Sequence, residues 1–264
     1  MFFTLHDENT TRVSITPIVT FLLLGITLLT FGYQVLLDMG EGDAAGVRMV
    51  MQHGLIPQHV LAGTTEFSTD AMVKKIGKAE VEHEAIELQI KTTRFWLYLS
   101  PLTYMFLHAG LLHLVSNLWF FWIFADNVEE RMGSSGFLAF YLLAGVAGGL
   151  LHLGLHTDSE APLIGASGAV SGLMGAYIVL FPGNRITSYF CPVWFYIRRI
   201  DVPAWIVLGF FLLLQSFALW NSDIMASRVA FDAHIGGFVV GMLSGVIVRA
   251  IPANLPVSAE SEPG

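Results

Sequence analysis

Six long apolar segments constrain the fold of this chain more than any other feature of its sequence. A helix of about 20 apolar residues crosses a hydrocarbon core about 30 Å thick, and segments of this kind recur along the chain. They lie at about 15–37, 110–124, 137–155, 161–182, 203–219 and 229–251. Hydrophobic residues make up 54% of the chain and charged residues 13%, against about 25% charged in soluble proteins. We therefore expect an all-α membrane protein, built as a bundle of six transmembrane helices.

The intervals between these segments predict the domain organisation. A short N-terminal segment, residues 1–14, precedes a six-span domain over residues 15–251, and residues 252–264 form a short tail. Within the domain, a long first loop runs from about residue 38 to residue 100. We expect a charged helix over residues 69–92 of this loop, solvated or lying at the interface, because lysines there alternate with glutamates. The first apolar segment has the full length of a span, so we expect no cleavable signal peptide.

The distribution of arginine predicts how the spans are oriented. Arginine occurs in the short loops at 126–135 and 183–201, whereas the loop at 157–160 has no basic residue. Short loops that are rich in Lys and Arg stay in the cytoplasm. This rule predicts that both termini are cytoplasmic and that the long first loop lies on the opposite side of the membrane.

Composition also argues against several classes of function. The net charge of −8 offers no basic face for nucleic acid, so we expect no nucleic-acid partner. A single cysteine, Cys191, rules out an intramolecular disulfide and a metal site built from several cysteines. The lipid bilayer is the one partner that composition does predict.

A hydroxyl among small residues opens the fourth apolar segment. Ser167 is flanked by Gly165, Ala166 and Gly168, and Pro162 favours irregular chain before a helix that begins at Ser167. The first turn of a helix carries unpaired N–H groups, which suit it to hold an oxyanion beside a nucleophilic serine. A packing seam is the alternative explanation, because the glycines of this helix also allow close contact between helices.

Costly polar residues recur in two further spans at the same predicted depth. His113 and Asn117 share one helix face near the start of the second span, and Asp232 and His234 lie near the start of the sixth. The second, fourth and sixth spans run in the same direction, so their first turns lie near one face of the membrane. Ser167 is then expected at the level of these groups.

Small residues predict that the sixth span packs against the fourth. They recur at every fourth position of the sixth span, at Ala233, Gly237, Gly241 and Gly245. The fourth span carries a matching row at Gly168, Ser171 and Gly175. Tight packing of the two rows would bring His234 within reach of Ser167, whose proton an imidazole can accept. Asp232 points to another helix face than His234, so we expect a Ser-His dyad rather than a triad. The alternative for His234 taken alone is a structural role, as a histidine that packs between helices and is hydrogen bonded there.

Several motifs together resemble the rhomboid family of intramembrane serine proteases. They are GASGAVSGLMGAY around Ser167, AHIGGFVVG around His234, HAGLLHLVSN over 108–117 and FADNVEERMG over 124–133. The segment FYIRRIDVPAWIVLGFFLLLQ, before and within the fifth span, is similar to bacterial members, and the resemblance covers about residues 101–251. GLIPQ at 54–58 looks like a fragment of the family's long first loop.

The resemblance implies a rhomboid-like bundle and a role for each matching residue. Ser167 would be the nucleophile, and His234 the general base and then the general acid. His113, Asn117 and the backbone N–H of Ser167 would bind the oxyanion. The residues that would shape the site are Gly165, Ala166 and Gly168.

Other matches to the family are structural, and the chain departs from the family's pattern at several positions. Glu129 and Arg131 would have structural roles after the second span, while the fifth span and residues 221–228 would form a gate over the site. Many family members have a tyrosine one helical turn after the serine, where this chain has Ser171. The orientation of His234 must then depend on other neighbours.

The function that the resemblance implies is that of a serine endopeptidase, which hydrolyses peptide bonds in or near transmembrane segments of membrane proteins. No metal or organic cofactor is expected, and a bacterial-type member would be a multi-pass protein of the bacterial inner membrane. Two alternatives are a non-catalytic rhomboid-like protein that binds or escorts membrane segments, and an enzyme that hydrolyses lipid carbonyls.

A metal site or a transporter is a further alternative, because His152 and His156 lie four residues apart on the third span. The sequence shows no carboxylate ligand near this pair. We therefore expect the two histidines to line the wet end of that span rather than to bind a metal.

Overall fold

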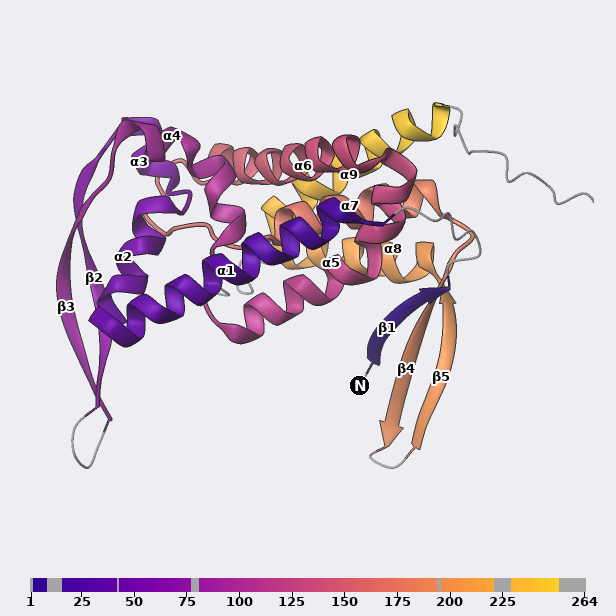
Figure 1. Cartoon of the computed structure of the whole chain (residues 1–264), viewed down its shortest axis with the longest axis horizontal. Coiled ribbons are helices and arrows are strands. Elements are labelled where there is room, and N and C mark those ends of the chain that lie inside the picture. Colours follow the sequence, from indigo (N-terminus) through magenta and orange to yellow (C-terminus); the bar gives the residue numbers. More distant parts are fainter. Residues whose placement is uncertain are drawn as a thin grey trace, which may run out of the picture.

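The computed structural model describes residues 2–8, 16–41, 43–76, 81–193, 196–220 and 229–251. Most of these residues are helical, and the long helices form a bundle with strands at its two ends (Figure 1). The hairpin of β2 (Glu66–Ile76) and β3 (Val81–Lys91) lies at one end. The sheet of β1 (Phe2–Glu8), β4 (Arg185–Val193) and β5 (Tyr196–Pro203) lies at the other.

Helices occur at all six apolar segments. They are α1 (Ile18–Glu41), α5 (Leu111–Met132), α6 (Ser134–Leu155), α7 (Ser167–Leu180), α8 (Ala204–Trp220) and α9 (Phe231–Ala250). Shorter elements lie between α1 and α5, namely α2 (Asp43–His53), α3 (Pro57–Ala62), α4 (Arg94–Thr103) and the 3-10 turn η1 (Tyr104–Phe106). The predicted start of a helix at Ser167 is confirmed.

Four of these helices are long and apolar enough to cross a membrane. They are Ile18–Met39 of α1, and the whole of α5, α6 and α9. The other two apolar helices are shorter, with 14 residues in α7. A helix of that size is about 21 Å long, less than a hydrocarbon core of about 30 Å. The protein is therefore a multi-pass membrane protein by the length and composition of its helices, while the count of six crossings stays a prediction.

The expectation of a charged helix over residues 69–92 is wrong, because the described residues 69–76 and 81–91 pair as the antiparallel strands β2 and β3. The burial pattern of β3 explains the difference. Leu88 and Ile90 are buried, and the residues between and beside them are exposed. A period of two is typical of a strand with one buried face, and this face joins a small apolar cluster with Met51 and Ile56.

The loop at 183–201 also contains strands. β4 pairs antiparallel with β5 and with β1, so the sheet has the order β1-β4-β5. The fold is therefore mostly helical, as expected, but the all-α expectation is wrong for the two sheets that lie outside the bundle.

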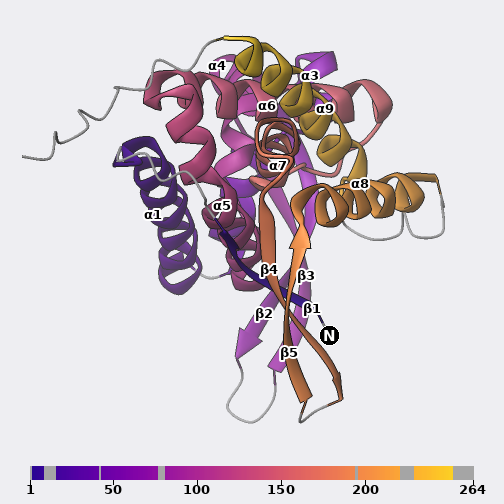
Figure 2. The ribbon, with the colours of Figure 1, turned by 90° about the vertical axis from the view of Figure 1, so that its right-hand side faces the viewer.

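The short helix α7 lies at the centre of the bundle. Its ten residues from Gly168 to Tyr177 are all buried, which is the pattern of a helix enclosed on every side. Figure 2 looks along α7 and shows α5, α6, α8 and α9 around it. Near its start, Gly168 lies beside Ala233 of α9 and Gly148 of α6.

Glycines bring α7 and α9 into direct backbone contact. A Cβ on Gly237 would overlap the carbonyl oxygen of Gly168, and one on Gly241 would overlap that of Gly172. Only residues without a side chain allow helices to approach this closely. The predicted packing of the sixth span on the fourth is confirmed, with Gly172 rather than Ser171 opposite the second contact.

Charged side chains pair with the ends of two helices, in line with the structural roles expected of Glu129 and Arg131. The buried Glu129 accepts hydrogen bonds from the N–H groups of Val19 at 3.0 Å and Thr20 at 2.7 Å, in the first turn of α1. Arg131 donates to the carbonyl oxygen of Val248 at 2.8 Å, in the last turn of α9. These bonds satisfy backbone groups that a helix leaves unpaired at its ends.

The substitution Gly241→Ala tests the seam between α7 and α9. We expect it to reduce the free energy of unfolding by about 1–3 kcal/mol, the usual cost of overpacking a filled core. Gly32→Ala in α1 is the matched control, because nothing lies within 4 Å of its Cβ position. The control should be neutral or stabilising, since alanine is the better helix former. Thermal unfolding in detergent micelles measures both, and equal behaviour of the two variants would contradict the seam.

Candidate active site

Ser167 follows a turn that two other parts of the chain hold in place. The N–H of Gly165 donates to the carbonyl oxygen of Tyr104 at 2.9 Å. Leu163 exchanges two backbone hydrogen bonds with Leu55, of 2.8 and 3.1 Å. Gly165 has a φ of +116°, a conformation that favours glycine. The backbone is thus fixed on both sides of the turn, while Ser167 itself stays partly exposed.

The ring of His113 and the amide of Asn117 lie beside this turn. Both residues belong to the first two turns of α5. A Cβ on Gly165 would lie 2.7 Å from Nε2 of His113 and 3.7 Å from Nδ2 of Asn117. The start of α5 therefore meets the turn two residues before Ser167.

Hydrogen bonds around these two side chains show which atoms can donate to the turn. Nδ1 of His113 accepts a long hydrogen bond of 3.4 Å from the N–H of Ala109. In a neutral ring the proton then lies on Nε2, the nitrogen beside Gly165. Nδ2 of Asn117 donates to the carbonyl oxygen of His113 at 3.1 Å, and its amide has a second N–H. Both side chains therefore offer a donor near Ser167.

His108 adds an uncharged ring to this part of the site. It packs edge-on against His113, with ring centroids 5.1 Å apart. Its ring is buried, and burial lowers the pKa of His108 to about 4. The ring is therefore neutral at neutral pH and brings no positive charge close to His113.

His234 lies in the first turn of α9, beside the glycine seam. The carbonyl oxygen of its neighbour Ala233 is 3.5 Å from the Cβ position of Gly168, the residue that follows Ser167. The first turns of α7 and α9 are therefore side by side. Within the described part of the chain, no hydrogen bond joins the side chains of Ser167 and His234.

The partner of His234 is Gln215 of α8, whose Oε1 lies 2.9 Å from Nδ1 of the ring. An amide oxygen only accepts, so Nδ1 carries the proton and Nε2 is left as an acceptor. Sequence reasoning missed this residue, although a polar side chain within the apolar run FFLLLQSF was a signal. Gln215 is a neighbour that can orient the ring in the absence of the family's tyrosine.

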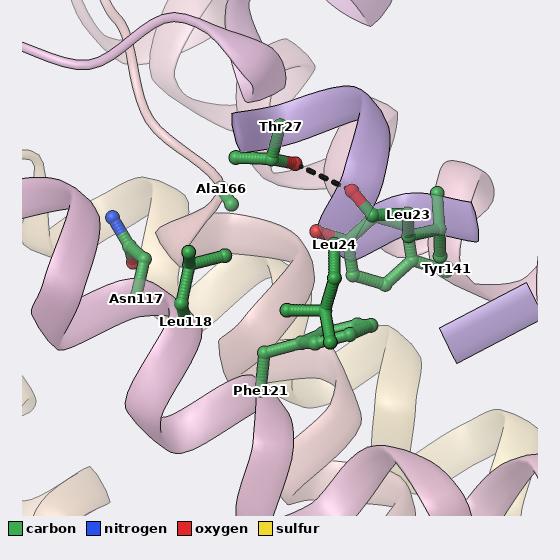
Figure 3. A pocket seen from close by; sticks show the side chains of 8 residues that line it. All are labelled: Leu23, Leu24, Thr27, Asn117, Leu118, Phe121, Tyr141 and Ala166. Carbon is green, nitrogen blue, oxygen red and sulfur yellow. Dashed lines mark hydrogen bonds between the residues drawn. The ribbon is translucent and has the colours of Figure 1, made fainter. Parts of the chain in front are cut away.

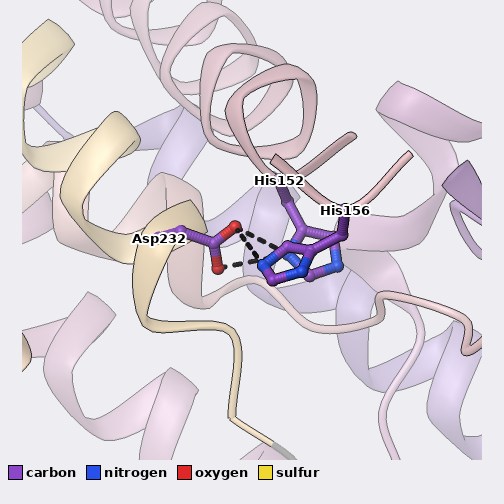
Figure 4. Close-up of side chains that lie close together, drawn as sticks. All are labelled: His152, His156 and Asp232. Carbon is purple, nitrogen blue, oxygen red and sulfur yellow. Dashed lines mark hydrogen bonds and ion pairs between the residues drawn. The ribbon is translucent and has the colours of Figure 1, made fainter. Parts of the chain in front are cut away.

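Asp232 pairs with α6 rather than with His234. Its Oδ2 lies 2.9 Å from Nδ1 of His152 and 3.2 Å from Nε2 of His156 (Figure 4). The expectation that these two histidines have no carboxylate nearby is therefore wrong. The partner comes from a residue 80 positions away from His152, which the packing of α6 on α9 brings close.

A narrow pocket borders the site on the side of α1 (Figure 3). Its lining residues are Leu23, Leu24, Thr27, Asn117, Leu118, Phe121, Tyr141 and Ala166. Asn117 and Ala166 belong to the site as well, since Ala166 directly precedes Ser167. The turn therefore lies beside polar donors from α5 and a mainly apolar wall from α1, α5 and α6.

Comparisons with known proteins identify the family. The Rhomboid domain model matches residues 94–251, which is more than half of the chain. Rhomboid protein 1, mitochondrial, of Saccharomyces cerevisiae is 32% identical over 147 residues, covering 53% of this chain and 39% of that protein. Rhomboid protease GlpG of Yersinia pestis (strain Pestoides F) is 28% identical over 158 residues, covering 57% of this chain and 47% of that protein. The chain thus spans less than half the length of these relatives. The Rhomboid domain match includes α4 to α9 and the site residues described above. This protein belongs to the rhomboid family.

Proposed function

We propose that this protein is an intramembrane serine protease that hydrolyses peptide bonds in or near transmembrane segments of other membrane proteins. The observation that carries the proposal is the contact between the first turns of α7 and α9, which carry Ser167 and His234. Nucleophilic catalysis needs a hydroxyl beside a base with a free acceptor nitrogen. The relative from Yersinia pestis is itself named a protease, which supports the same activity here.

In the proposed reaction, Oγ of Ser167 attacks the scissile carbonyl carbon while Nε2 of His234 takes the hydroxyl proton. His234 then gives this proton to the leaving amine, and an acyl-enzyme remains on Ser167. Water attacks the acyl carbon and passes a proton through His234 back to Ser167, which releases the new carboxyl group. The two side chains are not hydrogen bonded here, so they must approach on substrate binding, as is common for catalytic pairs.

The negative charge that develops on the carbonyl oxygen needs donors aimed at it. The N–H groups of Ser167, His113 and Asn117 are the donors in this proposal. Fixed donors in a site that excludes bulk water stabilise such a charge more than water does, because they need no reorganisation. The close fit of Gly165 against the ring of His113 supports this role.

Helix chemistry limits the substrate. A transmembrane helix keeps its carbonyl groups in internal hydrogen bonds, so the scissile bond must lie where the helix can unwind. Glycine and proline lower the cost of unwinding, so we expect segments that contain them near the membrane edge to be preferred. The short α7 would place Ser167 below the membrane surface, within reach of water from one side.

We also propose the topology that the sequence predicts. The shorter helices α7 and α8 serve as two further crossings beside the four long ones, which gives six. An even number places both termini on the same side, and the arginines of the loops at 126–135 and 183–201 favour the cytoplasm. The resemblance to bacterial members favours the bacterial inner membrane.

Ser167→Ala is the first test. The wild-type protein, reconstituted in liposomes without added cofactor, should cleave a reporter protein with one transmembrane segment, and Ser167→Ala should remove all measurable cleavage. Ser171→Ala, at a buried position one helical turn later in α7, is the control and should retain cleavage within a few-fold. Cleavage that persists in Ser167→Ala would refute the proposed nucleophile. An inactive wild type that no serine-directed phosphonate labels would favour the non-catalytic alternative.

The proposed oxyanion donors allow a second test. We expect His113→Ala and Asn117→Ala each to lower kcat by about 10²–10³, the usual effect of removing one oxyanion donor. KM should change little, because the charge develops only in the transition state. Ser116→Ala on the exposed side of the same helix is the control and should behave as wild type. If the control and the two variants lose activity to the same degree, the donors have no specific role.

Gln215 is proposed as a positioning residue for His234. Gln215→Leu removes the acceptor at Nδ1, so the ring can rotate and change tautomer, and kcat should fall at least about tenfold. Gln215→Glu keeps an acceptor at Nδ1 of His234, so this variant should be more active than Gln215→Leu. Its pH optimum should shift upward, because a carboxylate favours the charged form of the His234 ring. Ser216→Ala, the adjacent residue on α8, is the control. An unaltered pH profile in Gln215→Glu would show that the contact does not act on His234.

A further inference from the structure

We propose that His152, His156 and Asp232 form a binding site for a divalent cation of the zinc class. The proposal concerns groups that take no part in the reaction described above. It rests on the geometry of the cluster, its chemical composition, and the charges around it.

The three side chains converge on one point (Figure 4). Their ligand atoms, one from each residue, all lie within 4.8 Å of one another. Oδ2 of Asp232 is 2.9 Å from Nδ1 of His152 and 3.2 Å from Nε2 of His156. Zinc bonds of about 2.0–2.2 Å in a tetrahedron place neighbouring ligand atoms about 3.3 Å apart, so small movements would admit the ion.

The donor set selects the kind of cation. Two imidazoles and one carboxylate suit zinc and related transition metals, whereas calcium and magnesium prefer oxygen ligands. Zinc takes four ligands, and three come from the protein. The side chain of His156 is 33% exposed, so a water molecule has access for the fourth position.

The surroundings also favour a positive charge. The carboxylate of Asp232 is 2% exposed, and a buried carboxylate needs a compensating partner. His152 lies in the last turn of α6 and His156 caps it, where the helix dipole presents partial negative charge. Asp158 and Glu160 follow within the next few residues and add two exposed carboxylates.

A bound cation would join the C-terminal end of α6 to the first turn of α9. Both helices contribute ligands, and Gly148 of α6 already lies against the carbonyl oxygen of Ala233 in α9, at 2.6 Å from its Cβ position. The ion would therefore act as a structural clamp at that contact. Hydrogen bonds from the two histidines to Asp232 are the competing explanation, and they require no metal.

Zinc titration of the full-length protein distinguishes the two. The protein is purified in detergent with an affinity tag that lacks histidine, stripped with a chelator and dialysed, and then titrated with Zn²⁺ in a calorimeter. We expect one equivalent to bind, with affinity at least tenfold weaker in His156→Ala and in Asp232→Asn. Mg²⁺ should give no signal. His53→Ala on α2 is the matched control, because His53 is a partly buried histidine bonded to the carbonyl of Met49.

Thermal unfolding gives a second readout that does not depend on protease activity. Zn²⁺ should raise the midpoint of wild type and of Ser167→Ala by the same amount and leave that of His156→Ala unchanged. If Asp232→Asn fails to fold, the zinc response of His156→Ala, a variant at a partly exposed position, still tests the site. Absence of zinc binding in the wild type, or equal binding in wild type and His156→Ala, would overturn the site and favour hydrogen bonds alone.

Discussion

Backbone contact between α7 and α9 is the constraint on which the rest of the structure depends. Because Gly168, Gly237 and Gly241 have no side chains, the peptide groups of the two helices meet directly. Helices in lipid gain little from hiding apolar side chains from one another, so close packing of this kind holds them together. The seam begins in the first turn of each helix. The seam therefore brings the start of α7, with Ser167, close to the start of α9, with His234.

Much of this arrangement could be predicted because its signals are local and periodic. The rows of small residues in the fourth and sixth apolar segments predicted the seam, and the serine between Gly165 and Gly168 predicted where α7 begins. The identity of the second glycine contact depends on the rotation of α7 about its axis. Sequence spacing did not resolve that rotation, so Ser171 was expected where Gly172 lies.

Contacts between distant segments could not be predicted in the same way. A lone polar residue in an apolar helix indicates that it has a polar partner, but not which residue that partner is. The contacts of Gln215, His152 and His156 could therefore not be predicted. The helix face of Asp232 separates it from His234 but does not indicate that His152 and His156 lie on that side. In the first loop, the charged residues suggested a helix, whereas the alternating burial of Leu88 and Ile90 belongs to a strand.

Two side chains in the first turn of α9 have polar partners of different kinds. Asp232 faces the histidines of α6, and His234, two residues later, faces the amide of Gln215 on α8. A carboxylate at Nδ1 would stabilise a charged imidazole as well as orient it, whereas a neutral amide mainly orients it. In the proposed dyad, α8 therefore contributes orientation with little charge. In the proposed mechanism, the position of α8 against α9 therefore sets the orientation of the His234 ring through Gln215.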